Sequence, residues 1–104
     1  MGPWGVLVLA GLFEIVWAIG LKYSDGFSKL WPSVLTVAAM VISFLLLAQA
    51  MKSLPVGTAY AVWVGIGAVG TATLAVVLFG EPVTAMRVVG IGLILAGIIA
   101  LRLA

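Results

Sequence analysis

Four long apolar stretches, separated by short polar segments, make up almost the whole chain. Each stretch approaches the ~20 residues that a helix needs to cross a bilayer. The segments between them contain turn-forming residues, as in Ser24-Asp25-Gly26 and Gly80-Glu81-Pro82. The pattern therefore predicts an all-α membrane protein, in which residues 1–104 form a single transmembrane domain with four helices. We expect the spans at about residues 3–21, 32–51, 56–79 and 83–101.

Composition supports this class and excludes several others. Hydrophobic residues make up 65% of the chain and charged residues only 8%, whereas about 25% is usual in soluble proteins. Cysteine and histidine are both absent, which removes thiolate and imidazole chemistry and the usual zinc ligands. We therefore expect no metal, no cofactor and no enzymatic activity. The basic residues are spread over the ends of different spans, so they form no patch for nucleic acid.

The distribution of Lys and Arg gives only a weak preference for one orientation in the membrane. With four spans, Lys52 and Arg102 lie on the side of the termini, and Lys22, Lys29 and Arg87 lie on the other side. Because the two counts are nearly equal, insertion in either direction is compatible with the positive-inside rule. Two copies inserted in opposite senses would pair as an inverted repeat.

Glu14 is the only ionisable side chain within the first span. An acidic residue at the centre of a membrane helix costs roughly 2.5–3.5 kcal/mol on insertion scales. No Lys, Arg or His lies deep inside a span to pair with it, since Arg87 stands in the first turns of the fourth span, where its long side chain can reach the headgroups. We therefore interpret Glu14 as a functional carboxylate that holds either a proton or a cation, and this competition would couple their movements.

Aromatic and hydroxyl side chains occur at comparable depths. Trp17 follows Glu14 by three residues, Tyr60 and Trp63 have the same spacing in the third span, and Ser43 lies near the middle of the second. A carboxylate with aromatic faces and hydroxyls around it suits a cation. The alternatives are an interfacial aromatic belt for Tyr60 and Trp63 and a helix–helix contact for Ser43.

Glycines indicate close packing and bending. The third span is rich in glycine, so we expect a hinge there, at Gly65 and Gly67. In the fourth span, Gly90 and Gly97 bracket an apolar face that would allow a close helix–helix contact, either with a second copy or within one subunit. A single chain is small for enclosing a pocket, which favours a site shared by two copies of Glu14.

Two segments carry a family resemblance. FEIVWAIGLK (residues 13–22) together with PVGTAYAVWVGIGAVG (residues 55–70) closely resembles the small multidrug resistance family of bacterial inner-membrane transporters, and the likeness extends over all four spans. Trp17 and the GTAYAVW run are similar to the guanidinium-exporter branch. Val64 is a departure, because that branch commonly has Thr at this position.

The resemblance implies an antiparallel, dual-topology homodimer that exports guanidinium in exchange for protons. Glu14 would be the carboxylate shared by proton and substrate. The other implied roles are pocket residues Trp17, Ser43, Tyr60 and Trp63, a helix bend at Gly65 to Gly67, and a dimer contact at Gly90 to Gly97.

These observations lead to a functional hypothesis. We expect a proton-coupled antiporter that exports guanidinium and small substituted guanidinium cations across the bacterial inner membrane. Its partners would be the cation, protons, the bilayer and a second copy of the chain. One alternative is a broader exporter of quaternary ammonium and aromatic cations; alternatives of another class are a non-transporting membrane subunit and a passive cation pore.

Overall fold

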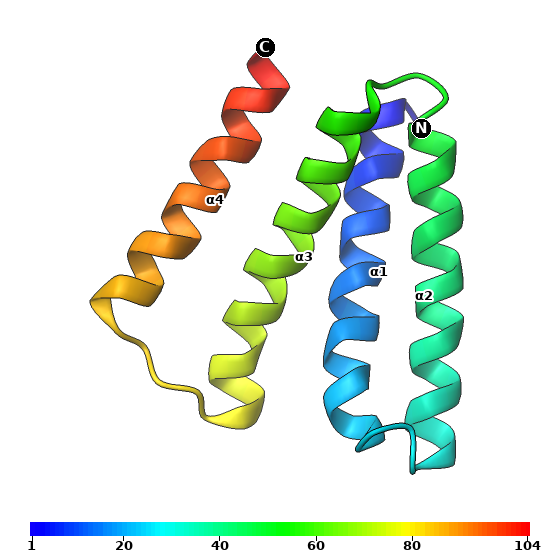
Figure 1. Ribbon diagram of the computed structural model, residues 1–104, viewed down its shortest axis with the longest axis vertical. Coiled ribbons are helices and arrows are strands. Elements are labelled where there is room, and N and C mark those ends of the chain that lie inside the picture. The colour runs from blue at the N-terminus through cyan, green and yellow to red at the C-terminus, as the bar shows by residue number, and fades with distance from the viewer.

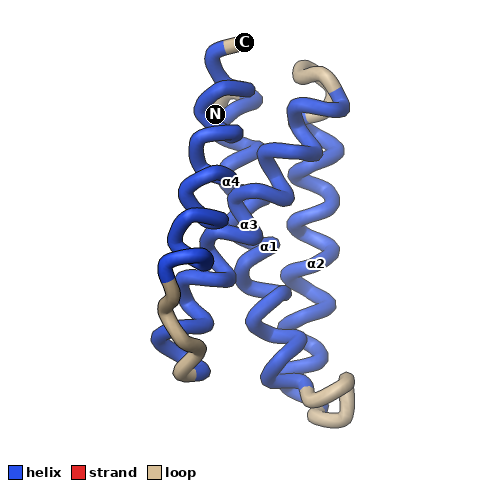
Figure 2. The backbone as a smooth tube through the Cα atoms, turned by 60° about the vertical axis from the view of Figure 1, so that its left-hand side comes forward, coloured by secondary structure: helices blue, strands red, loops and turns tan.

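The computed structural model describes residues 1–104, and helices are its only regular elements (Figure 2). Each of the four helices is long and apolar enough to cross a membrane. The predicted all-helical class with four membrane-spanning helices is thus confirmed. The helices are α1 (Pro3–Ser24), α2 (Leu30–Ala50), α3 (Val56–Phe79) and α4 (Ala85–Leu103).

Local chemistry explains where the helices begin and end. Pro3 stands in the first turn of α1, where its missing N–H removes no helical hydrogen bond. The helix ends at Asp25, which adopts the left-handed conformation with φ 49°, and therefore extends three residues beyond the expected end at residue 21. Thr84 caps α4 by accepting a hydrogen bond from the Arg87 amide, so that this helix begins at Ala85 and not at residue 83.

The helix α1 is central in the arrangement. It packs against α2 on one side and α3 on the other, while α4 packs mainly against α3 (Figure 1). Both termini and the connection between α2 and α3 lie at one end, and the other two connections lie at the opposite end (Figure 1). The helices α1 and α3 consequently run parallel, with Glu14 on the face between them.

The buried core is small and belongs to the first three helices. Only 15 of the 104 residues are buried, and none of them lies on α4. The main core cluster consists of Leu7, Ala10, Leu47, Ala50, Ala59, Val62 and Trp63. Most apolar side chains thus face outward, as expected for a protein whose surroundings are lipid tails and not water.

Candidate functional site

Glu14 faces α3 at a position where that helix has no side chain. Gly67 is buried, and a Cβ atom placed on it would overlap the carboxyl group of Glu14. The close approach of α1 and α3 at this level therefore depends on glycine. The partly buried carboxylate lies directly against the backbone of α3.

No group in the chain neutralises or hydrogen-bonds the buried oxygen of Glu14. Its Oε2 atom is inaccessible and has no hydrogen-bond partner. The one ion pair of the chain joins Arg87 to Glu81 over 2.7 Å, at the end of α3 and the start of α4. A buried acid without a partner is costly, and a bound proton or cation would offset that cost.

A groove of about 380 Å³ runs from Glu14 along α3 toward the connection with α4. At that end, Arg87 donates to a Glu81 carboxylate oxygen and, over 2.8 Å, to the Pro82 carbonyl. Between Glu14 at one end and the Arg87–Glu81 pair at the other, most of the lining side chains are small and leave the groove open. The groove is lined by Glu14, Ala18, Val64, Gly67, Ala68, Thr71, Ala72, Ala75, Glu81 and Arg87.

Ser43 connects three helices at the level of the core. Its hydroxyl donates a 2.7 Å hydrogen bond to the Ala10 carbonyl of α1 and accepts a 2.9 Å bond from the Trp63 indole of α3. Ser43 is fully buried, and Trp63 is nearly so. In the single chain this hydroxyl therefore positions Trp63 and makes no hydrogen bond with Glu14, an arrangement that agrees with the helix–helix alternative for Ser43.

Three predicted aromatic residues belong to one continuous row. The ring of Trp17 meets that of Phe44 at 6.2 Å, Phe44 meets Trp63 at 5.8 Å, and Trp63 meets Tyr60 at 5.6 Å. These separations suit edge-to-face and tilted aromatic pairs. Phe44 is the member that the sequence analysis missed, although it follows Ser43 directly.

The predicted pocket is only partly assembled within one chain. Trp17, Ser43, Tyr60 and Trp63 form the connected set just described, but none of the four lines the groove that contains Glu14. Their convergence with Glu14 into one pocket stays a prediction. Thr71, which no sequence motif singled out, does line the groove, four residues after Gly67 and seven after Val64 on the same helical face.

The predicted glycine positions fall into two groups. Gly65 and Gly67 are buried against Ile98 of α4 and Glu14 of α1, and α3 is a continuous helix through both. Their role as a hinge stays a prediction. A Cβ atom added at Gly90 or Gly97 would meet no atom within 4 Å, so the alternative of close packing within one subunit is wrong, and their role as a dimer contact stays a prediction.

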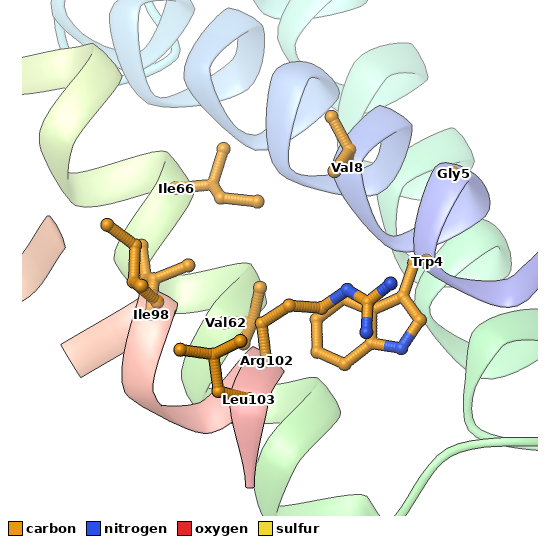
Figure 3. Close-up of a pocket in the computed structure, with 9 residues that line it drawn as sticks. Trp4, Gly5, Val8, Val62, Ile66, Ile98, Arg102 and Leu103 are labelled. Atoms are coloured by element: carbon orange, nitrogen blue, oxygen red, sulfur yellow. The ribbon is translucent and has the colours of Figure 1, made fainter. Parts of the chain in front are cut away.

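A second cavity, of about 530 Å³, lies between the N-terminal part of α1, α3 and the C-terminal part of α4 (Figure 3). Its lining is mainly aliphatic and contains no acid. The guanidinium of Arg102 lies 4.8 Å from the ring centre of Trp4, and this stacking joins the two helix ends (Figure 3). Because it lacks a carboxylate, this cavity is chemically unlike the Glu14 groove.

Together these features define a small multi-pass membrane protein in which one intramembrane acid faces a groove between two helices. The family model described as Small Multidrug Resistance protein matches residues 2–94, and the chain belongs to this family. Membership and the four membrane-spanning helices place it in the bacterial inner membrane.

Individual relatives are similar to this chain over nearly their whole length. The chain is 65% identical to a protein named guanidinium exporter from Yersinia pseudotuberculosis, over 97% of each chain. It is 63% identical to a guanidinium exporter from Escherichia coli, over 96% of this chain and 95% of the relative. A guanidinium exporter from Salmonella typhimurium is 59% identical over the same shares. The names of these relatives describe transporters.

Proposed function

We propose that the protein exports guanidinium and small substituted guanidinium cations in exchange for protons. The observation that carries this proposal is Glu14, which lines a groove and whose buried Oε2 atom has no hydrogen-bond partner in the chain. The names of relatives that are 59–65% identical support guanidinium as the substrate. Guanidinium is planar and permanently charged, and its paired N–H donors match one carboxylate in a bidentate manner.

Coupling follows from having one carboxylate for two ligands. A proton on Glu14 removes the charge that a cation needs, and a bound cation disfavours protonation. If the site opens alternately to the two sides of the membrane, a cation that bound from one side is displaced by a proton that enters from the other side, and the cation leaves on that other side. The exchange then needs no second acidic residue within the membrane.

We further propose that the working unit is an antiparallel homodimer of oppositely inserted chains. The nearly equal Lys and Arg counts on the two sides permit both orientations. The open glycine face of α4 supports a contact between copies, because small residues let membrane helices approach closely. A second chain would also complete the wall of the groove. Reporter fusions after Ala104 should be active on both sides of the membrane, and activity on one side only would contradict dual insertion.

The test is transport by the purified protein in proteoliposomes with an imposed pH gradient. We expect the gradient to drive guanidinium uptake against its own concentration gradient, and Glu14→Gln to abolish it. Asp25→Asn is the matched control, since Asp25 is an exposed loop acid whose left-handed backbone conformation also suits Asn. Coupled transport by Glu14→Gln would contradict the proposal.

The same assay separates the alternatives. Downhill guanidinium flux that is insensitive to pH would indicate a passive pore. Transport of tetraalkylammonium or aromatic cations but not of guanidinium would indicate the broader exporter, for which the aromatic row from Trp17 to Tyr60 offers cation–π surfaces. Absence of flux for every cation would indicate a non-transporting subunit.

A further inference from the structure

Thr71 has an unusual environment for a threonine in a helix. Threonine hydroxyls within helices commonly donate to the carbonyl four residues earlier. Thr73 follows this rule, with a 2.8 Å bond to Val69, and its hydroxyl is exposed. The hydroxyl of Thr71, two residues away, is buried and has no hydrogen-bond partner.

Thr71 and Glu14 line the same groove, and each has a buried oxygen without a hydrogen-bond partner. The other polar side chains that line the groove, Glu81 and Arg87, already form an ion pair with each other. Gly67 faces Glu14, and Thr71 is four residues further along the same face of α3, a rise of about 6 Å between the two backbone positions at 1.5 Å per residue. A small cation with N–H donors on two sides can reach groups that lie one helical turn apart.

We propose that Thr71 is a second ligand of the cation in the Glu14 groove. In this arrangement, which rests on the proposed function, one edge of a guanidinium cation donates to the Glu14 carboxylate and another N–H donates to the Thr71 hydroxyl oxygen. Val64, on the same helical face, brings no hydroxyl to the groove. Thr71 therefore selects for cations that carry N–H donors over quaternary ammonium cations, which have none.

The test compares Thr71→Val with Thr71→Ser in the reconstituted protein. Valine keeps the size of the side chain and removes the hydroxyl, while serine keeps the hydroxyl. We expect Thr71→Val to raise KM for guanidinium roughly three- to tenfold, the loss of one hydrogen bond, with little change in kcat. Thr71→Ser should stay close to the unaltered protein. Thr73→Val is the matched control and should leave KM unchanged, because its hydroxyl bonds its own helix.

A second probe separates ligand contact from a general effect on packing. Tetramethylammonium, tested as a competitor of guanidinium transport, has no N–H, so Thr71→Val should weaken its competition less than it weakens guanidinium transport. Equal loss for both cations would overturn the proposal, as would an unchanged KM in Thr71→Val or equal loss in Thr71→Ser. Thr71→Ala provides the same comparison if valine prevents folding.

Failure of this inference is distinguishable from failure of the proposed function. If Thr71 is not a ligand, pH-driven guanidinium transport persists with an unaltered KM in Thr71→Val, and Glu14→Gln still abolishes transport. If the proposed function is wrong, the unaltered protein itself shows no pH-driven guanidinium transport, which also overturns the assignment of Thr71 as a guanidinium ligand.

Discussion

The indole N–H of Trp63 donates a 2.9 Å hydrogen bond to the hydroxyl of Ser43, deep in the three-helix core. The same hydroxyl donates to the Ala10 carbonyl, so α1, α2 and α3 share one polar connection. Such a connection fixes the orientation of the Trp63 ring. Because Trp63 contacts Phe44, it also influences the orientation of the other rings in the aromatic row. The orientation of a proposed cation-binding surface thus depends on one serine.

Replacement of Ser43 by alanine tests this connection. We expect Ser43→Ala to lower the free energy of unfolding by about 1 kcal/mol, because the Trp63 indole loses its buried acceptor. Denaturant-induced unfolding in detergent, followed by tryptophan fluorescence, measures the change. Ser33→Ala is the control, since the Ser33 hydroxyl is exposed and bonds its own helix at the Lys29 carbonyl. Equal losses in the two variants would contradict a special role for Ser43.

Gly67 is expected to be essential for the position of the carboxylate. In Gly67→Ala the added Cβ would occupy the space of the Glu14 carboxyl group, which must then move. Misplacement of a binding group by about 1 Å can reduce rates up to about a hundredfold, so we expect guanidinium transport to fall at least about tenfold while the protein still folds. The initial rate of pH-driven uptake measures this loss.

The control for Gly67 lies on the same helix. A Cβ on Gly57 would meet no atom within 4 Å, so Gly57→Ala should leave transport unchanged. Transport by Gly67→Ala at the rate of Gly57→Ala would show that the carboxylate tolerates displacement.

Gly97 tests the proposed contact between copies. Since Gly97 is exposed and a Cβ atom added there would meet no atom of its own chain within 4 Å, Gly97→Leu should leave the fold of the single chain intact. A close approach of helices through small residues would be blocked by leucine. We expect the dimer fraction, measured by light scattering in detergent, to fall severalfold at equal protein concentration. Val77→Leu on α3 is the control, because this side chain is already large and 77% exposed, and the dimer fraction should stay unchanged. An unchanged dimer fraction in Gly97→Leu would place the interface elsewhere.

Much of the fold could be predicted from the apolar pattern, because the length of an uninterrupted apolar run sets whether a helix can cross a bilayer. Helix ends were less certain. The late start of α4 depends on the hydroxyl of Thr84 accepting from the Arg87 amide, a local choice that hydropathy does not encode. Similarly, the apolar character of α4 did not reveal that the helix packs mainly against α3.

Some features of the candidate site could likewise be predicted from the sequence, and others could not. The position of Glu14 as an intramembrane acid without a basic partner follows from the sequence, since every Lys and Arg lies at or near the end of a span. The folded chain was needed to show that Gly67 faces this acid, that Ser43 bonds Trp63, and that Thr71 lines the same groove as Glu14. Helical periodicity defines the faces of each helix, whereas the rotation and register that bring two faces together arise from packing between segments far apart in the chain.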